Sequence, residues 1–428
     1  MTHADAPAAP QRRDTTPELV GAGWVGMMLL AQFGVFMAQI TVMAFTLSVR
    51  LDQLAPGHEE YLGYLLGIGS LAAMVASPVV GTLSDRTRSR FGRRRPWILL
   101  PAALGLGALL LVALAPTVPV LGLGWIACHL TWGVAGAAIG NTLADTLPPR
   151  QRGKVAGLAG MVTMAAPITG ILLAGALTHN TLLLLLVPGA IGLACVLPFV
   201  LFGGEPDSRH LPAGDRLTVS TLLRTYTWDV RAYPAFSWNW LGRFVFTIGM
   251  SYATSFTAFF FAARLGVPVD QIGALVAMTG LAGGAASMLV GLGGGFLSDR
   301  VGSRKPFVVG GAVVFALGAV LLAFAHDIAG LTVGVLVMNG GLGAFMAVGG
   351  ALVLDVLPER ATQAGRFNAI NGLANALPQA LAPLTAPALL TIGAVGADKN
   401  YQLLYLVAAA IAAIGGLIIV RVRPDADA

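Results

Sequence analysis

Charged residues are scarce in this chain: Asp, Glu, Lys and Arg together make up 11% of its 428 residues. Hydrophobic residues make up 56%, and the mean hydropathy is +0.78. A composition with so little charge excludes a soluble globular protein and, with it, most classes of enzyme.

Cysteines and catalytic motifs are also rare or missing. The two cysteines, Cys128 and Cys195, lie within apolar segments, so neither a disulfide framework nor a thiolate metal site is expected. No Walker phosphate loop, His-Glu-x-x-His or Gly-x-Ser-x-Gly sequence occurs, which argues against ATP hydrolysis by the chain itself and against intramembrane hydrolysis. We therefore expect no enzymatic activity, no cofactor and no metal site.

Long apolar segments are abundant. Twelve stretches of about twenty apolar residues recur, each long enough to cross a hydrocarbon core of about 30 Å as a helix. They fall into two groups of six with matching spacing, at residues 23–47, 61–83, 96–115, 120–143, 155–177 and 181–202, and then at 235–261, 271–297, 306–325, 329–354, 367–390 and 401–420. The sequence predicts an all-α membrane protein with twelve transmembrane helices.

A polar stretch between the two groups sets the domain organisation. We expect an N-terminal tail at 1–22, a six-helix bundle at 23–203, a central loop at 204–234, a second six-helix bundle at 235–421 and a C-terminal tail at 422–428. The 55 glycines suit close packing of membrane helices, and pairs four apart such as Gly63 and Gly67 favour packing within one chain over dimerisation. A monomer is expected.

Lys and Arg residues are distributed unevenly about the predicted helices. With the N-terminus placed in the cytoplasm, 22 of the 26 cations fall in tails and loops on that side, and only Arg50, Arg264 and Lys399 fall on the other. Arg243 is the one cation inside a segment. We expect both termini in the cytoplasm, a location in the cytoplasmic (inner) membrane, and no nucleic-acid partner, because topology alone explains the net charge of +6.

An internal repeat marks the loops on the expected cytoplasmic side. The sequence Gly-x-x-Ser-Asp-Arg ends at Arg86 after the second segment and at Arg300 after the eighth, 214 residues later, and a basic run follows each copy. A second pair runs from Asp145 to Arg150 and, 210 residues later, from Asp355 to Arg360. The chain is predicted to be a duplicated six-helix unit.

The Gly-x-x-Ser-Asp-Arg loop with its basic run resembles the signature loop of the major facilitator superfamily. Its longer form here, Ser-Asp-Arg-x5-Gly-Arg-Arg-Arg-Pro, is similar to that of the sucrose transporter and glycoside-pentoside-hexuronide branch. The resemblance implies two pseudo-symmetric six-helix bundles that move by alternating access.

Acidic residues beside arginines at helix ends can hold neighbouring loops together in one state and release them in another. The expected members of this conformational lock are Asp85, Arg86, Arg93, Arg94, Arg95, Asp145, Arg150, Asp299, Arg300, Arg304, Asp355 and Arg360. The alternative is that these basic residues only fix the topology.

Ionisable residues are nearly absent from the middle of the segments. All 20 Asp and Glu residues fall in tails, loops or helix ends, which departs from ion-coupled sugar transporters of the similar branch. Only His129 and Arg243 remain near the expected midplane, where charge is costly. Arg243 is a candidate clamp for a carboxylate or a hydroxyl pair, and His129 a candidate proton carrier or hydrogen-bonding residue. Each could instead be a packing residue satisfied within the protein.

Other polar and aromatic residues lie on segments that line the central cavity in the similar superfamily. Indole rings stack on sugar faces, and amides exchange hydrogen bonds with hydroxyls. These candidate substrate-binding residues are Gln32, Gln39, Trp125, Trp132, Asn239, Trp240, Asn339, Asn371 and Asn375. Alternatively, the tryptophans form interfacial belts and the asparagines bond helix to helix.

These features predict a secondary transporter that takes up a sugar or glycoside, with a proton as the coupling ion carried by His129. The alternative is an efflux antiporter for small apolar or drug-like compounds, since the segments also carry methionines and lack an embedded acid. A membrane sensor or scaffold is disfavoured because the tails and central loop leave no room for an output domain.

Overall fold

The computed structural model describes residues 19–205, 207–210, 226–359, 363–394 and 399–423, and its regular elements in these ranges are all helices. The first half, called the N half, contains α1 (Ala22–Thr41), the π-helix η1 (Val42–Thr46), α2 (Leu47–Leu54), α3 (Tyr61–Arg86), α4 (Arg95–Leu114), α5 (Val118–Thr146), α6 (Pro149–Gly175) and α7 (Thr181–Phe202).

The second half, called the C half, repeats this order. It contains α9 (Pro234–Ser255), α10 (Thr257–Leu265), the 3-10 turn η2 (Val269–Gln271), α11 (Gly273–Val301), α12 (Lys305–Ala323), α13 (Ile328–Asp355), α14 (Ala364–Thr391) and α15 (Tyr401–Ile419). α13 begins 210 residues after α5, and the same offset separates the second pair of repeated loop sequences. The duplication seen in the loops therefore includes these two helices.

Most predicted segments match a helix to within a few residues, and the differences have physical reasons. The first segment continues through η1 and α2 to Leu54, and the seventh breaks at Phe256 into two helices bent by 49°. Ten helical units of the described chain are long and apolar enough to cross a membrane, and the bent pair makes eleven. α14 has 28 residues and is not in this set, because it carries three internal prolines and polar residues such as Asn371 and Asn375.

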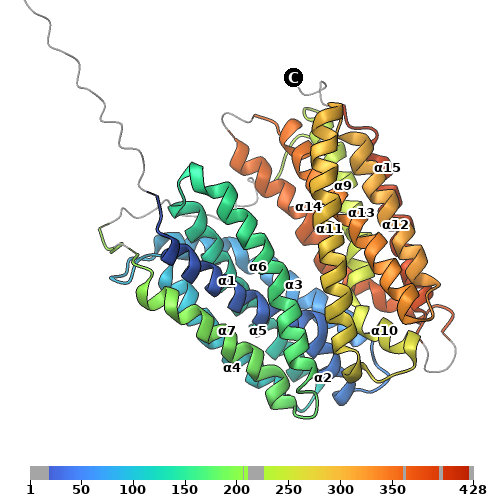
Figure 1. The fold of residues 1–428 in the computed structure, drawn as a ribbon, viewed down its shortest axis with the longest axis horizontal. Helices are drawn as coiled ribbons and strands as arrows, with labels where there is room; N and C mark the ends of the chain where they lie inside the picture. Colours follow the sequence, from blue (N-terminus) through green and yellow to red (C-terminus); the bar gives the residue numbers. More distant parts are fainter. Residues whose placement is uncertain (1–18, 206, 211–225, 360–362, 395–398, 424–428) are drawn as a thin grey trace, which may run out of the picture.

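The two halves lie side by side (Figure 1). They are parted at the end of the molecule where α1 begins and α15 finishes, which we call the termini face, and they converge near α2 and α10 at the other end, the distal face. Gly63 and Gly67 of α3 permit this convergence, because a Cβ atom at Gly63 would lie 2.3 Å from the Pro383 carbonyl oxygen of α14 and one at Gly67 would lie 2.3 Å from Leu384. This glycine pair thus packs within one chain.

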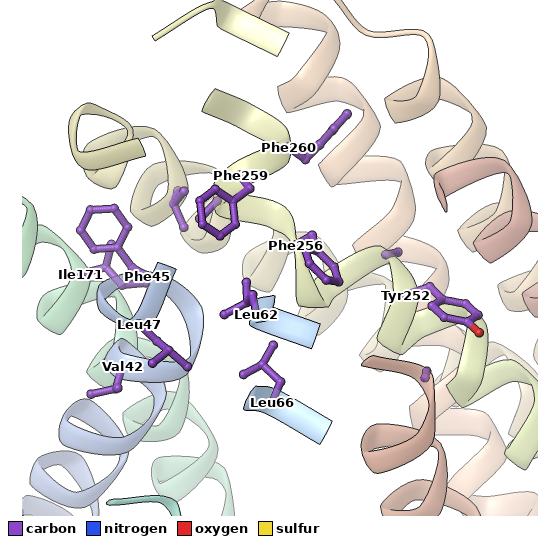
Figure 2. Close-up of a cluster of buried hydrophobic side chains, with 14 of the residues drawn as sticks. Val42, Phe45, Leu47, Leu62, Leu66, Ile171, Tyr252, Phe256, Phe259 and Phe260 are labelled. Atoms are coloured by element: carbon purple, nitrogen blue, oxygen red, sulfur yellow. The ribbon is translucent and has the colours of Figure 1, made fainter. Parts of the chain in front are cut away.

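An apolar cluster seals the distal part of the contact between the halves. Phe45 and Leu47, at the break in the first helical unit, lie on one side of this seal, and Phe256, Phe259 and Phe260, at the break between α9 and α10, lie on the other (Figure 2). The seal residues are almost fully buried. The structure is therefore closed by side chains at the distal face.

Candidate functional site

A network of ions at the termini face joins the ends of three N-half helices. Arg94, just before α4, lies with Nη1 2.8 Å from Asp85 Oδ1 at the end of α3. Its Nη2 lies 3.0 Å from Asp145 Oδ2 at the end of α5, and its Nη1 also donates to Ser84 Oγ. The Arg94 side chain is only 7% exposed, so one guanidinium holds three helix ends together. Together with Arg93, 3.1 Å from Asp145, these residues form what we call the N-half lock.

A further carboxylate, which the sequence did not single out, completes the N-half lock. Glu205, after α7, accepts hydrogen bonds at 2.8 to 3.0 Å from the backbone N–H groups of Arg93, Arg94 and Arg95. Free N–H groups at a helix start favour an anion. Gly204, with φ of +62°, makes the left-handed turn that precedes Glu205. In the sequence, the Gly-Gly-Glu run that ends at Glu205 is the feature that could have indicated this contact.

The pseudo-equivalent C-half lock is looser. Arg304 Nη1 lies 3.1 Å from Asp355 Oδ2, but its Nη2 lies 3.7 Å from Asp299 Oδ1, and the Arg304 side chain is 27% exposed. A cavity of about 480 Å³ adjoins these residues. In the ranges that the structure describes, no carboxylate fills the start of α12 as Glu205 fills that of α4.

The remaining predicted lock residues take no part in these ion pairs. Arg86 and Arg95 are partly buried, and each has a guanidinium nitrogen without a hydrogen-bond partner among the described residues. Arg150 and Arg300 are exposed. Arg360 lies outside the described residues.

Four predicted residues lie on α9 and α14, two on each helix. Arg243 Nε donates to Asn375 Oδ1 at 3.2 Å, and its Nη2 lies 3.5 Å from Met346 Sδ. In the described part of the chain no acidic side chain pairs with Arg243. One turn away on each helix, Asn239 Nδ2 and Asn371 Oδ1 are buried without a hydrogen-bond partner. We call Asn239, Arg243, Asn371 and Asn375 the C-half polar cluster.

Trp240 borders this cluster but is already engaged. Its indole N–H donates to the Ile370 carbonyl oxygen at 2.8 Å, and its ring stacks on Phe244 with centroids 5.2 Å apart. The ring therefore ties α9 to α14 in this conformation.

The N half holds a cavity of about 320 Å³ between α1, α3, α4 and α5, toward the termini face. Gln39 and His129 line it together with Ser77 and Asn141. His129 Nδ1 is buried without a hydrogen-bond partner in the described chain, and its ring lies 5.0 Å from that of Trp125. A buried imidazole with an unused nitrogen is available to a ligand or a proton.

A larger cavity of about 530 Å³ lies between the halves. Its wall is mainly apolar and contains Met161 and Met164 from the N half and Met288 and Met338 from the C half. Among its few polar lining residues is Asn339, whose Nδ2 donates to the backbone of its own helix at 3.0 Å.

His129 and Asn339 occupy equivalent positions in the duplicated unit. The offset between α5 and α13 is 210 residues, the same as the separation of these two side chains. The duplication therefore places an imidazole on the wall of the N-half cavity and an amide on the wall of the cavity between the halves.

The C-half polar cluster, Trp240 and three further predicted substrate-binding residues line neither of these two cavities. Trp125 and Trp132 are fully buried, and their rings pack against Gly69 of α3 and Gly105 of α4, respectively. Gln32 donates to Thr163 Oγ1 at 2.8 Å and so joins α1 to α6. A stacking role for the two tryptophans stays a prediction that this conformation does not support, because their faces are covered.

Comparison with known proteins places the whole chain in one family. The family model of the Major Facilitator Superfamily matches residues 25–294 and 240–428. Among solved structures, a mutant form of the nucleoside transporter NupG superposes with a TM-score of 0.74 at 14% identity, covering 93% of this chain and 99% of that one. A bacterial homologue of the lysosomal transporter Spinster, in an inward-facing and occupied conformation, gives a TM-score of 0.68 at 16% identity, covering 94% and 96%. Likeness at this level of identity shows the fold.

Similar sequences include transporters of different kinds. The mouse (Mus musculus) solute carrier family 45 member 3 is 42% identical over 69 residues, which is 16% of this chain and only 11% of that protein. The class C tetracycline resistance protein of Escherichia coli is 28% identical over 305 residues, covering 66% of this chain and 69% of that protein. The chain thus spans a small part of the first of these relatives and about two thirds of the second.

Proposed function

This chain belongs to the major facilitator superfamily and is a membrane transporter with a small-molecule substrate, and we propose that it takes up a sugar or glycoside by alternating access with proton coupling. The observation that carries this proposal is the C-half polar cluster. Arg243 has no acidic partner in the described chain, and Asn239 and Asn371, one turn away on the same two helices, hold buried amide atoms without a hydrogen-bond partner there. A ligand rich in hydroxyl or carboxylate oxygens supplies the missing partners.

The geometry of Arg243 suits such a ligand. Nε donates to Asn375, and Nη2 donates to the Met346 thioether sulfur, which is a weak acceptor. A planar guanidinium with free terminal N–H groups binds two oxygens of one ligand side by side.

His129 is the proposed proton carrier. It is the ionisable side chain on the wall of the N-half cavity, and its Nδ1 has no partner in the described structure. Gln39 lines the same cavity and offers an amide to substrate hydroxyls.

The proposed orientation places the termini face in the cytoplasm, on the evidence of the cation distribution. The apolar seal at the distal face then closes the outer side, and the structure corresponds to an inward-facing state. The N-half and C-half locks lie on the cytoplasmic side, where we propose that they rearrange when the transporter turns outward. We propose a monomer in the cytoplasmic membrane.

A second candidate function, efflux of small apolar compounds, is favoured by one specific observation. The cavity between the halves has a methionine-rich wall, and methionine adapts to apolar ligands of varied shape. The similarity to a tetracycline resistance protein agrees with this candidate.

A binding panel separates the two candidates. Purified protein is heated with monosaccharides, disaccharides, uronic acids or lipophilic cations, because a ligand of the folded state raises the melting temperature. The sugar proposal predicts stabilisation by a sugar or uronic acid that disappears in Arg243→Gln and persists in the control Met288→Leu. Stabilisation by lipophilic compounds only, reduced in Met288→Leu and unchanged in Arg243→Gln, contradicts it.

A further inference from the structure

Two polar contacts join the halves at the distal face. Glu60 Oε2 lies 2.7 Å from Lys399 Nζ, and the Tyr401 hydroxyl donates a hydrogen bond to Glu59 Oε2. The two glutamates end the loop before α3, whereas Lys399 and Tyr401 lie at the start of α15. In the described chain, the pair Glu60–Lys399 is the one ion pair that joins the N half to the C half.

These contacts are shielded from water. The side chains of Lys399 and Glu60 are 13% and 16% exposed, and Tyr401 is 4% exposed. The Tyr401 ring lies 5.9 Å from that of Phe260, a member of the apolar seal. The polar contacts therefore adjoin the seal, where the low local dielectric strengthens an ion pair relative to a fully exposed one.

We propose that Glu59, Glu60, Lys399 and Tyr401 form a latch for the distal gate. The latch is a set of gating residues outside the substrate site, and it holds the distal face closed until the transporter changes to its outward-facing state. Opening the distal face separates the start of α15 from the loop before α3, so both contacts must break. Closing it forms them together. The latch is independent of what the substrate is.

The ionisation of the two glutamates agrees with this role. Burial alone would raise the pKa of Glu60, but hydrogen bonds from Lys399 and His58 outweigh it and lower that pKa, which keeps the ion pair charged. Burial raises the pKa of Glu59, although the hydrogen bond from Tyr401 and the charge of Lys399 oppose the change. The Glu60 carboxylate thus pairs with Lys399, while Glu59 accepts a hydrogen bond from the Tyr401 hydroxyl.

The distance between spin labels on the two halves tests the latch. Thr117 and His326 are exposed residues of distal loops, one on each half, and both accept a cysteine label in a background without Cys128 and Cys195. Wild type should show mainly the short, closed-gate distance. Lys399→Glu should reduce the ratio of closed to open gate by about tenfold or more, because two carboxylates then face each other.

Charge exchange makes the test specific to this pair. The double variant Glu60→Lys with Lys399→Glu should restore most of the closed population. Asp327→Asn is the matched control: it removes one carboxylate charge from the distal side, keeps an oxygen that can cap α13, and should change nothing. If Lys399→Glu does not fold, Lys399→Gln provides the weaker version of the same change.

Two results would overturn the latch. One is an unchanged distance distribution in a folded charge-reversal or Lys399→Gln variant. The other is an open population that the charge exchange leaves as large as in the single variant.

Discussion

The two locks at the termini face occupy equivalent positions but differ in strength. In the N-half lock, Arg94 is 7% exposed and lies 2.8 Å and 3.0 Å from two carboxylates, while Glu205 anchors the backbone around it. In the C-half lock, Arg304 is 27% exposed and one of its two separations reaches 3.7 Å. Both halves carry the same residue types at these positions because the six-helix unit is duplicated. The N-half lock is tighter because its arginine is more buried and because Glu205 adds a carboxylate.

The largest expected difference between the locks is in stability. Arg94→Ala removes the buried guanidinium that Asp85 and Asp145 share, and it should lower the free energy of unfolding by about 2 kcal/mol, because the two carboxylates left behind are 58% and 46% exposed. Arg304→Ala should lower it by about 1 kcal/mol or less, because the exposed pair is screened by water. Thermal unfolding of the two purified variants in the same detergent measures the contrast. Equal losses would mean that the difference in burial has no energetic consequence.

Transport rate should show the same asymmetry. Asp85→Asn weakens an interaction that we propose must rearrange in each cycle, and coupling energies of about 0.5 to 2 kcal/mol correspond to turnover roughly two- to thirtyfold slower. Asp299→Asn should slow turnover less, since Asp299 is the more distant partner of Arg304. Uptake rates in liposomes at matched protein density report this effect, with substrate affinity expected to stay close to wild type. A larger defect in Asp299→Asn would reverse the proposed ranking.

Removing the added carboxylate should make the N-half lock more like the C-half lock. Glu205→Gln keeps a hydrogen-bond acceptor but removes the charge at the start of α4, which should cost about 1 kcal/mol or less. Glu205→Ala should cost more because the three backbone N–H groups also lose their acceptor. Melting temperatures of both variants, with Asp207→Asn as a control in the same segment, measure the two contributions. No loss in Glu205→Ala would remove Glu205 from the lock.

The closed state of the distal face should depend on pH. The pKa of Glu59 is raised when the gate is closed, so this group stabilises the closed gate at low pH, and the contribution is lost as pH rises through the raised pKa. The charges that act on Glu59 come from Lys399, Asp52 and Glu60, and Tyr401 donates to it.

Spin-label distances measured from neutral pH downward should therefore show a modest increase in closed gate. Glu59→Gln should flatten this response, whereas the matched control Asp327→Asn should retain it. A slope that persists in Glu59→Gln would assign the response to another group.

The fold could be predicted from the sequence because the apolar segments are long enough to indicate membrane helices, and the repeated loop sequences indicate the duplication. The segment at residues 181–202 matches α7 at both ends, and the 210-residue offset relates α5 to α13. The breaks after Thr41 and at Phe256 were not predicted, because η1 and the α9–α10 bend interrupt apolar sequence without a proline. Both breaks lie at residues of the apolar seal, where the two halves pack together.

The candidate site was predicted only in part. Arg243 and Asn375 meet as partners, and His129 and Gln39 share a cavity, because helical spacing and midplane position select them. Trp125 lies against Gly69 instead of a cavity, since spacing defines a helix face but not the neighbour that this face meets. Glu205 and the latch glutamates Glu59 and Glu60 were missed because loop carboxylates have no periodicity that would select them.

In the proposed mechanism the two halves have different roles, with the C half anchoring substrate and the N half carrying the proton. Isothermal titration with the best-binding sugar from the panel compares wild type, Arg243→Lys, Arg243→Ala and His129→Gln at one pH. Loss of a charge-assisted contact is worth about 1.5 to 3 kcal/mol, so Arg243→Ala should bind about ten- to a hundredfold more weakly. Arg243→Lys should recover little, because an ammonium lacks the planar fork, and His129→Gln should bind nearly as well as wild type. Unchanged affinity in a folded Arg243→Ala, or a larger loss in His129→Gln than in Arg243→Ala, would contradict this division.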